Sequence, residues 1–275
     1  MFFLSRAGNV DGLAFYQAGA GTPVLLLHGV GLRAECWISQ IRILRRTCEV
    51  FAVDLPGHGE SQNPSGEKAT LEDYSLRIGE FIKNVVRRPA VVVGHSVGAL
   101  MALDVAFRFP KWCTGVAALN AVYRRPSSAK NAVLSRAKML QNGDDIVDAT
   151  IARWFGEKPA GRAQRAAVFC RKWLSSADRL EYASLYRVFA EEDGPADNAL
   201  SGLDVPALFL TGVDDINSVP SMSHAMAAQA PHGRAVIVNG GHLTQMSHAR
   251  EVNHALSAFV CECAATGQQA AAGGK

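Results

Sequence analysis

Residues 90–98, AVVVGHSVG, join an apolar run to a helical pattern through one tight turn. The continuous apolar run predicts a strand that is buried on both faces, and the pattern from 97 to 109 predicts a helix that Pro110 stops. Between them Ser96 is the centre of a Gly-x-Ser-x-Gly motif. Such a turn strains the backbone of its serine and needs small residues two positions before and after it. The motif therefore predicts that Ser96 is a nucleophile held above the sheet edge.

Further strands and helices alternate on both sides of this turn. Apolar runs at 23–28, 48–54, 115–120, 206–211 and 234–238 predict buried strands, and 13–17 predicts an antiparallel edge strand. Helical patterns occupy 70–86 and 248–263. This alternation is typical of an α/β fold with a doubly wound, mostly parallel sheet covered by helices on both faces.

One long segment breaks the alternation. Residues 124–203 contain no convincing strand, and helical stretches are predicted at 127–141, 145–155, 162–175 and 177–191. We interpret this insertion as a helical cap on a core formed by residues 1–123 and 204–265. The small, polar residues 266–275 predict a disordered tail.

Composition excludes several classes of protein. The chain has 275 residues and a net charge of only +3, which does not favour nucleic acid or an anionic membrane as a partner. No stretch approaches the length of a membrane span, and Met1 to Arg6 is too short in apolar residues for a signal peptide. Six scattered cysteines predict no disulfide framework, although Cys261 and Cys263 could form a strained disulfide or bind a metal. We expect a cytoplasmic protein that needs neither metal nor organic cofactor; its oligomeric state stays open.

A serine nucleophile needs a base and an acid that orients the base. The strand predicted at 206–211 is followed by Gly212-Val213-Asp214-Asp215, so either aspartate qualifies. Asp215 is favoured, and Asp214 remains the alternative. His242 follows the last predicted strand in a Gly-rich loop, which makes it the candidate base.

The oxyanion of an acyl-transfer intermediate needs two backbone N–H donors. Val97 supplies one, because it follows the nucleophile. The other is assigned to Val30 in the turn after the first long strand, with Gly31 as the alternative. His28 is interpreted mainly as a brace for this turn. The substrate pocket is predicted to include His28, Gly29, His95, Trp154 and Leu243. Arginines of the insertion, among which are Arg124, Arg125, Arg153 and Arg187, offer a possible carboxylate contact.

The chain resembles the α/β-hydrolase superfamily from about residue 10 to residue 263. The resemblance is carried by HGVG (28–31), DLPGHGES (54–61), GHSVG (94–98), TGVDD (211–215) and GGH (240–242). It implies an eight-stranded sheet, a helical cap and a serine triad, and it is most similar to the bacterial esterase, enol-lactonase and cofactor-free perhydrolase group. It also implies that Asp54 and His58 are structural.

The expected reaction is hydrolysis of a small to medium carboxylic ester or lactone through an acyl-enzyme on Ser96. Within the superfamily that this chain resembles, dehalogenases and epoxide hydrolases use aspartate as the nucleophile, so serine at position 96 disfavours their chemistry. Carbon–carbon hydrolases often carry asparagine where this chain has His95. Carbon–carbon hydrolysis, acyl transfer and perhydrolysis use the same triad and stay open as alternatives, as does a receptor on this fold.

Overall fold

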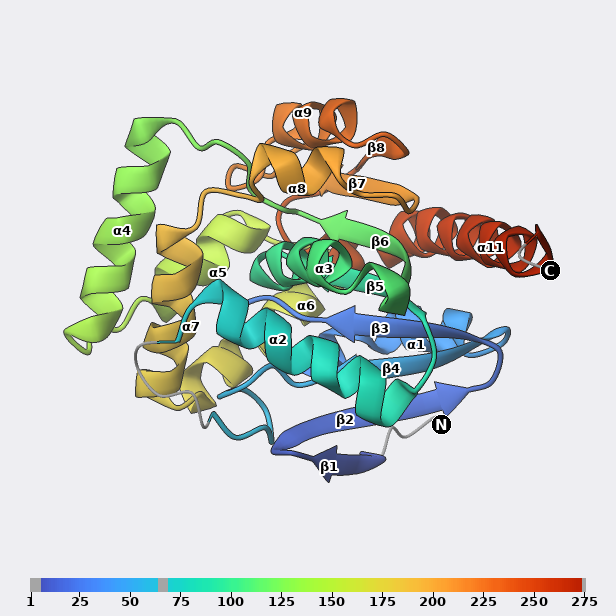
Figure 1. The fold of residues 1–275 in the computed structure, drawn as a ribbon. Coiled ribbons are helices and arrows are strands. Elements are labelled where there is room, and N and C mark those ends of the chain that lie inside the picture. Colours follow the sequence, from blue (N-terminus) through green and yellow to red (C-terminus); the bar gives the residue numbers. More distant parts are fainter. Residues whose placement is uncertain (1–5, 64–68, 274–275) are drawn as a thin grey trace.

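The computed structural model of the chain describes residues 6–63 and 69–273. Residues 1–5, which include most of the stretch considered as a signal peptide, lie outside the described residues. Figure 1 shows a single twisted sheet with helices on both faces. Its eight strands follow the order β1-β2-β4-β3-β5-β6-β7-β8, and every neighbouring pair from β4 to β8 is parallel. The predicted doubly wound, mostly parallel sheet is therefore confirmed.

The strands coincide closely with the apolar runs. They are β1 (Gly8–Val10), β2 (Leu13–Gly19), β3 (Thr22–Leu27), β4 (Cys48–Val53), β5 (Ala90–His95), β6 (Cys113–Leu119), β7 (Ala207–Gly212) and β8 (Gly233–Val238). The prediction that 13–17 forms an edge strand is wrong in one respect, because β1 lies outside β2. Asp11 and Gly12 both have positive φ and form the two-residue turn of a hairpin, which adds β1 to the sheet.

Helices cover both faces of the sheet, as a doubly wound fold requires. On one face, α2 (Leu71–Phe81), which continues as a π-helix (Ile82–Val86), packs against α3 (Val97–Arg108), and α3 packs on β5 and β6. On the other face lie α1 (Ile38–Leu44) and α11 (Ala249–Gly273), which pack against each other (Figure 1). The helix α9 (Pro220–Gln229) packs on β7 and β8, and the short α10 (Thr244–Ser247) precedes α11. Short 3₁₀ helices occupy Ala34–Trp37 and Pro110–Trp112.

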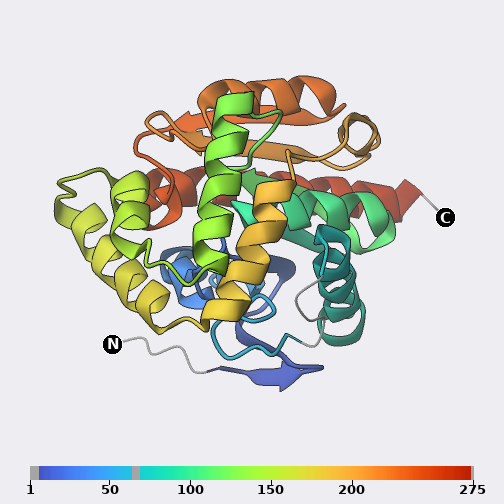
Figure 2. The same cartoon turned by 90° about the vertical axis from the view of Figure 1, so that its left-hand side faces the viewer.

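Five helices form the segment between β6 and β7. They are α4 (Ser127–Gln141), α5 (Val147–Phe155), α6 (Gly161–Ser176), α7 (Arg179–Glu191) and α8 (Asp197–Ser201). In Figure 1, α4, α5 and α7 lie on the side toward which the arrowheads of β3 and β6 point. Figure 2 looks onto that side and shows α4 and α7 crossing in front of the core. The segment therefore lies beside the carboxyl ends of the parallel strands, where ligands bind in open α/β sheets.

The C-terminal helix is longer than its apolar pattern. The predicted helix ended at Cys263, but α11 continues to Gly273 and takes up most of the predicted tail. Alanine has the highest helix propensity of the amino acids, and residues 264–265 and 270–272 are alanines, which favours this continuation. All six cysteines, including Cys261 and Cys263, are free thiols. Among residues 6–63 and 69–273, no helix combines the length and apolar character needed to cross a membrane.

Candidate active site

Ser96 occupies a strained turn between β5 and α3. Its φ of 55° and ψ of −119° are unusual for a residue with a side chain. A Cβ atom on Gly94 would lie 2.0 Å from the Gly98 carbonyl oxygen, and one on Gly98 would lie 2.4 Å from the His28 carbonyl oxygen. Both glycines are therefore sterically required, which is the physical basis of the Gly-x-Ser-x-Gly motif.

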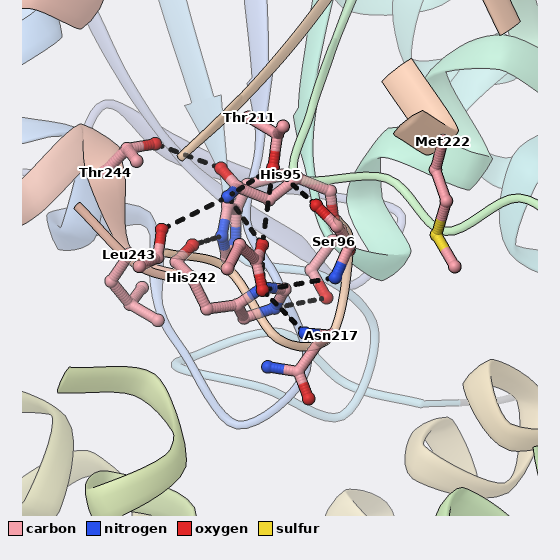
Figure 3. A network of polar contacts seen from close by, with 12 residues as sticks. His95, Ser96, Thr211, Asn217, Met222, His242, Leu243 and Thr244 are labelled. Carbon is pink, nitrogen blue, oxygen red and sulfur yellow. Dashed lines mark hydrogen bonds and ion pairs between the residues drawn. The ribbon is translucent and has the colours of Figure 1, made fainter. Parts of the chain in front are cut away.

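Two loops at the same sheet edge bring His242 and Asp215 to this serine. Figure 3 shows the side chain of His242 next to Ser96. The Nε2 atom of His242 lies 3.2 Å from Ser96 Oγ, and its Nδ1 atom lies 2.8 Å from Asp215 Oδ2. All three side chains are buried. His242 follows β8 and Asp215 follows β7. Along the chain His242 is 146 positions from Ser96 and 27 positions from Asp215, yet the three side chains form one hydrogen-bonded series. This geometry suits a serine whose proton is taken by a histidine that a carboxylate orients.

Asp215 is held as a carboxylate. Its Oδ1 atom accepts hydrogen bonds from the backbone N–H groups of Asn217 (2.8 Å) and Ser218 (3.1 Å). Burial by itself raises the pKa of Asp215, but the charge and hydrogen bond of His242 and the other donors outweigh it and lower this pKa to about 2. The side chain of Asp214 is instead exposed to solvent. Of the two aspartates left open by the sequence, it is Asp215 that contacts His242.

Asn120 is a site residue that the sequence analysis missed. Its Nδ2 atom donates to Asp215 Oδ2 at 2.8 Å, and its Oδ1 atom accepts from Thr244 Oγ1 at 3.0 Å. It directly follows β6 and has a positive φ of 52°. Its position as the polar residue that ends a central strand, at the same edge as Ser96, was the signal that could have identified it.

Val30 and Gly31, the two candidates for the second oxyanion donor, differ in the hydrogen bonding of their N–H groups. The Gly31 N–H donates to His58 Nε2 at 3.0 Å and is therefore occupied. For the N–H groups of Val30 and Val97, the described part of the chain provides no acceptor. Val30 lines the same cavity as Ser96, and Val97 is the residue that directly follows Ser96 in the chain. The hydrogen bonding thus favours Val30 over Gly31.

Three other histidines near the site are buried and neutral. His28 donates from Nδ1 to the Gly29 carbonyl (2.7 Å) and accepts from the Leu55 N–H at Nε2 (2.9 Å), so it braces two turns. His95 Nε2 donates to the His242 carbonyl at 2.8 Å. Burial, and secondarily the nearby His58, lowers the pKa of His28 well below its ordinary value. Burial lowers the pKa of His58 to about 4, and burial together with His242 lowers the pKa of His95 to about 3.

These histidines make the fold sensitive to acid. Between about pH 6.5 and pH 4 the unfolded chain binds protons that buried His28, His58 and His95 do not, so stability falls as pH falls. Below the ordinary histidine pKa of about 6.5, each costs roughly 1.4 kcal/mol per pH unit. On going from pH 7.5 to 5.5 the three together therefore cost about 4 kcal/mol, most of it in the last pH unit. Burial raises the pKa of Asp54, which offsets part of the loss, whereas the lowered pKa of Asp215 acts only below about pH 4. Urea unfolding at the two pH values measures the difference.

The matched variant for this measurement is His58→Gln, which removes one of the three groups. It should reduce the pH dependence by roughly one third, because one proton uptake is lost from the unfolded chain. An unfolding free energy that is equal at pH 7.5 and 5.5 in the wild type would contradict the assignment of neutral buried histidines.

A narrow cavity lies over Ser96 and His242. Of the predicted pocket residues, Gly29, His95 and Trp154 line it, whereas His28 and Leu243 do not. Both side chains are fully buried: His28 is hydrogen-bonded to backbone groups, and Leu243 packs in the apolar core. The sequence analysis missed these lining residues: Leu32, Arg136, Thr150, Tyr186, Phe189 and Asn217. Thr150, Arg153 and Trp154 are spaced i, i+3 and i+4 on α5 and so share one helix face. This spacing could have predicted that Thr150 and Arg153 line the pocket together with Trp154.

The arginines predicted from the insertion separate into two groups. Arg153 lines the cavity. Arg125 is buried elsewhere, where its Nη2 atom donates to the Phe189 carbonyl at 2.8 Å. Arg187 donates to the Ala69 carbonyl at 2.7 Å and pairs with Glu191. Arg124 lies over the ring of Tyr123. Only Arg153 of these four is among the cavity residues that the structure describes.

The fold and the arrangement of Ser96, His242 and Asp215 are those of an α/β-hydrolase. Comparison with protein families agrees: the model of the alpha/beta hydrolase family matches residues 24–255. The chain belongs to this family.

Several similar proteins are named as hydrolases or esterases. An (E)-2-((N-methylformamido)methylene)succinate hydrolase of Acinetobacter baylyi is 34% identical over 90% of this chain and 93% of its own length. A pimeloyl-[acyl-carrier protein] methyl ester esterase of Stenotrophomonas maltophilia is 30% identical over 88% of this chain and 94% of its own. Among solved structures, the enol-lactonase of Burkholderia xenovorans has a TM-score of 0.84 at 23% identity, covering 94% of this chain and 100% of that one, and shares the fold. A malate-bound esterase of Thermogutta terrifontis has a TM-score of 0.80 at 25% identity, covering 94% and 97%.

Proposed function

We propose that this protein is a serine hydrolase that cleaves a carboxylic ester or lactone of a small substrate through an acyl-enzyme. The observation that carries the proposal is the continuous hydrogen-bonded series from Ser96 Oγ through His242 to Asp215. The strained backbone of Ser96 supports it, because such strain persists at functional sites where the surrounding structure imposes it.

In the proposed reaction, Ser96 Oγ attacks the substrate carbonyl while His242 Nε2 takes its proton. Asp215 accepts a hydrogen bond from the Nδ1–H group of His242, which keeps Nε2 free to act as the base and stabilises the imidazolium that forms. The N–H groups of Val30 and Val97 stabilise the oxyanion, each by roughly 3 kcal/mol. His242 then protonates the leaving alcohol or enol, and a water molecule repeats the sequence to release the acid.

The helical segment 124–203 acts in this proposal as the cap. The helices α4, α5 and α7 each contribute residues to the cavity over Ser96. The cavity is narrow and has room for only a few water molecules, so a larger substrate enters only when cap side chains or helices move. A small substrate needs the smallest movement.

Amide hydrolysis is the second candidate. The name of the Acinetobacter baylyi relative describes a succinate that carries an N-methylformamido group. The same serine chemistry serves amides when the histidine protonates a leaving nitrogen. The succinate in this name and the malate bound to the Thermogutta terrifontis esterase are both four-carbon dicarboxylates. This likeness favours an anionic substrate for the present protein. Carbon–carbon hydrolysis and acyl transfer remain further uses of the same triad.

The experiment that tests the proposal is covalent trapping of the nucleophile. A fluorophosphonate should inactivate the wild-type protein with one adduct per chain, and peptide mass spectrometry should place this adduct on Ser96. In parallel, p-nitrophenyl esters from acetate to octanoate should be hydrolysed, with the fastest turnover at the short end, because the cavity is narrow. An adduct on another serine, or no adduct at all, would contradict the proposal.

A further inference from the structure

The cavity over Ser96 has an unbalanced charge. Two arginines line it, Arg136 from α4 and Arg153 from α5, and no aspartate or glutamate is among the described residues that line it. Both arginines are half-buried. A pair of guanidinium groups in a narrow cavity is costly unless an anion neutralises them.

Neither arginine has a counter-ion within residues 6–63 and 69–273. Arg136 uses Nε to donate to the Tyr186 hydroxyl at 2.9 Å, which leaves its two Nη groups for another partner. Arg153 has neither a hydrogen bond nor an ion pair to the part of the chain that is described. Burial, followed by the like charge of Arg136, lowers the pKa of Arg153, so the two charges act on each other.

Arg125 shows what a structural arginine in the same segment looks like. Its Nη2 and Nη1 atoms donate to the carbonyls of Phe189 and Ala190 at the end of α7, and it pairs with Asp193 at 3.7 Å. Both of its Nη groups are therefore used within the protein. The contrast with Arg136 and Arg153 indicates that their donors serve a ligand.

An uncharged donor accompanies the arginines. The Nδ2 atom of Asn217 is buried without a hydrogen-bond partner among the described residues, and Asn217 lines the cavity. Figure 3 shows its amide pointing away from the hydrogen-bonded network of the triad. Its backbone N–H bonds to Asp215, so this amide is held close to the reacting centre.

We propose that Arg136 and Arg153 form a carboxylate-binding subsite, so that the substrate is an ester, lactone or amide that carries a free carboxylate near the scissile carbonyl. This inference rests on the proposed function for the bond that is cleaved. The Nη groups of an arginine match the two oxygens of a carboxylate, and such pairs are strong when water is excluded. Asn217 Nδ2 is placed to donate to a remaining substrate oxygen.

The test compares two esters of nearly equal shape. Monoethyl succinate carries a carboxylate where ethyl 4-methylpentanoate carries an isopropyl group. We expect the wild-type kcat/KM to be about 100-fold or more higher for the charged ester, since a site built for a polar group strongly rejects an analogue that lacks it. Arg136→Met and Arg153→Met should each reduce this ratio by about 10-fold or more, while hydrolysis of the neutral ester continues.

Arg165→Met is the matched control. Arg165 is an exposed arginine of α6 outside the cavity, so its replacement removes the same charge from the same segment and should leave the ratio unchanged. Arg136→Lys and Arg153→Lys keep the charge and serve where a methionine variant folds poorly. A wild-type ratio near one, or a ratio that the cavity variants and Arg165→Met change equally, would overturn the subsite.

A binding measurement separates failure of the subsite from failure of the proposed function. Calorimetric titration of the Ser96→Ala protein with succinate should show binding that Arg136→Met or Arg153→Met weakens by about 10-fold or more. Succinate binding without hydrolysis of either ester would overturn the serine-hydrolase proposal and support the subsite. Hydrolysis of both esters at equal rates without succinate binding would support the serine-hydrolase proposal and overturn the subsite. Absence of succinate binding to the Ser96→Ala protein overturns the subsite in every case.

Discussion

Replacing Ser96 with alanine should lower kcat for an ester by about 10⁴- to 10⁶-fold. The variant loses the oxygen that attacks the carbonyl and receives the acyl group, while the N–H groups of Val30 and Val97 remain. The residual rate should therefore exceed that of the uncatalysed reaction, and KM should change little, because ground-state contacts are preserved. Steady-state kinetics on a short p-nitrophenyl ester measures both constants.

Ser96→Gly is the informative companion variant. It also lacks the nucleophile, so its kcat should fall as far as that of Ser96→Ala. Glycine accepts a φ of 55° without strain, so Ser96→Gly should be more thermally stable than Ser96→Ala and at least as stable as the wild type. Turnover within about 10-fold of the wild type in either variant would mean that another group is the nucleophile.

Asp215→Asn should lower kcat by about 10³- to 10⁴-fold. In the wild type, the carboxylate accepts a hydrogen bond from the Nδ1–H group of His242 at 2.8 Å. An asparagine amide can instead donate to Nδ1, which moves the ring proton to Nε2 and prevents His242 from accepting the proton of Ser96. The asparagine Oδ1 atom can still accept the backbone N–H groups of Asn217 and Ser218, so the loop should keep its shape. Steady-state kinetics on the same ester, together with thermal unfolding, measures both effects.

Asp214→Asn is the matched control, because it makes the same chemical change one position earlier. The Asp214 side chain is exposed, and within the described residues Asp214 bonds only through its backbone N–H, which donates to the Gly240 carbonyl at 3.0 Å. Its kcat should stay within about 2-fold of the wild type. The reverse result, a silent Asp215→Asn and an inactive Asp214→Asn, would move the acid by one residue.

Local sequence was sufficient for the parts of this protein whose physics is local. A continuous apolar run predicts a buried strand wherever it occurs, and all six such runs are strands of the sheet. The turn at Ser96 was predictable because a Cβ atom on Gly94 would collide with the Gly98 carbonyl oxygen, a restriction that lies within the motif itself. Strand ends also indicated the edge at which the candidate site would lie.

Other features depend on contacts between distant segments, which no local pattern contains. Asp214 and Asp215 are neighbours of the same type, and their difference arises from where the loop after β8 places His242. Likewise, the use of the Gly31 N–H depends on His58, which is 27 positions away. Arg136 looks like any arginine on a polar helix until α4 packs against α7 and brings it to Tyr186 and the cavity. The local backbone chemistry of this chain thus made its strands and the turn at Ser96 predictable, whereas packing between segments determined which aspartate contacts His242, which N–H group His58 occupies and which arginines line the cavity over Ser96.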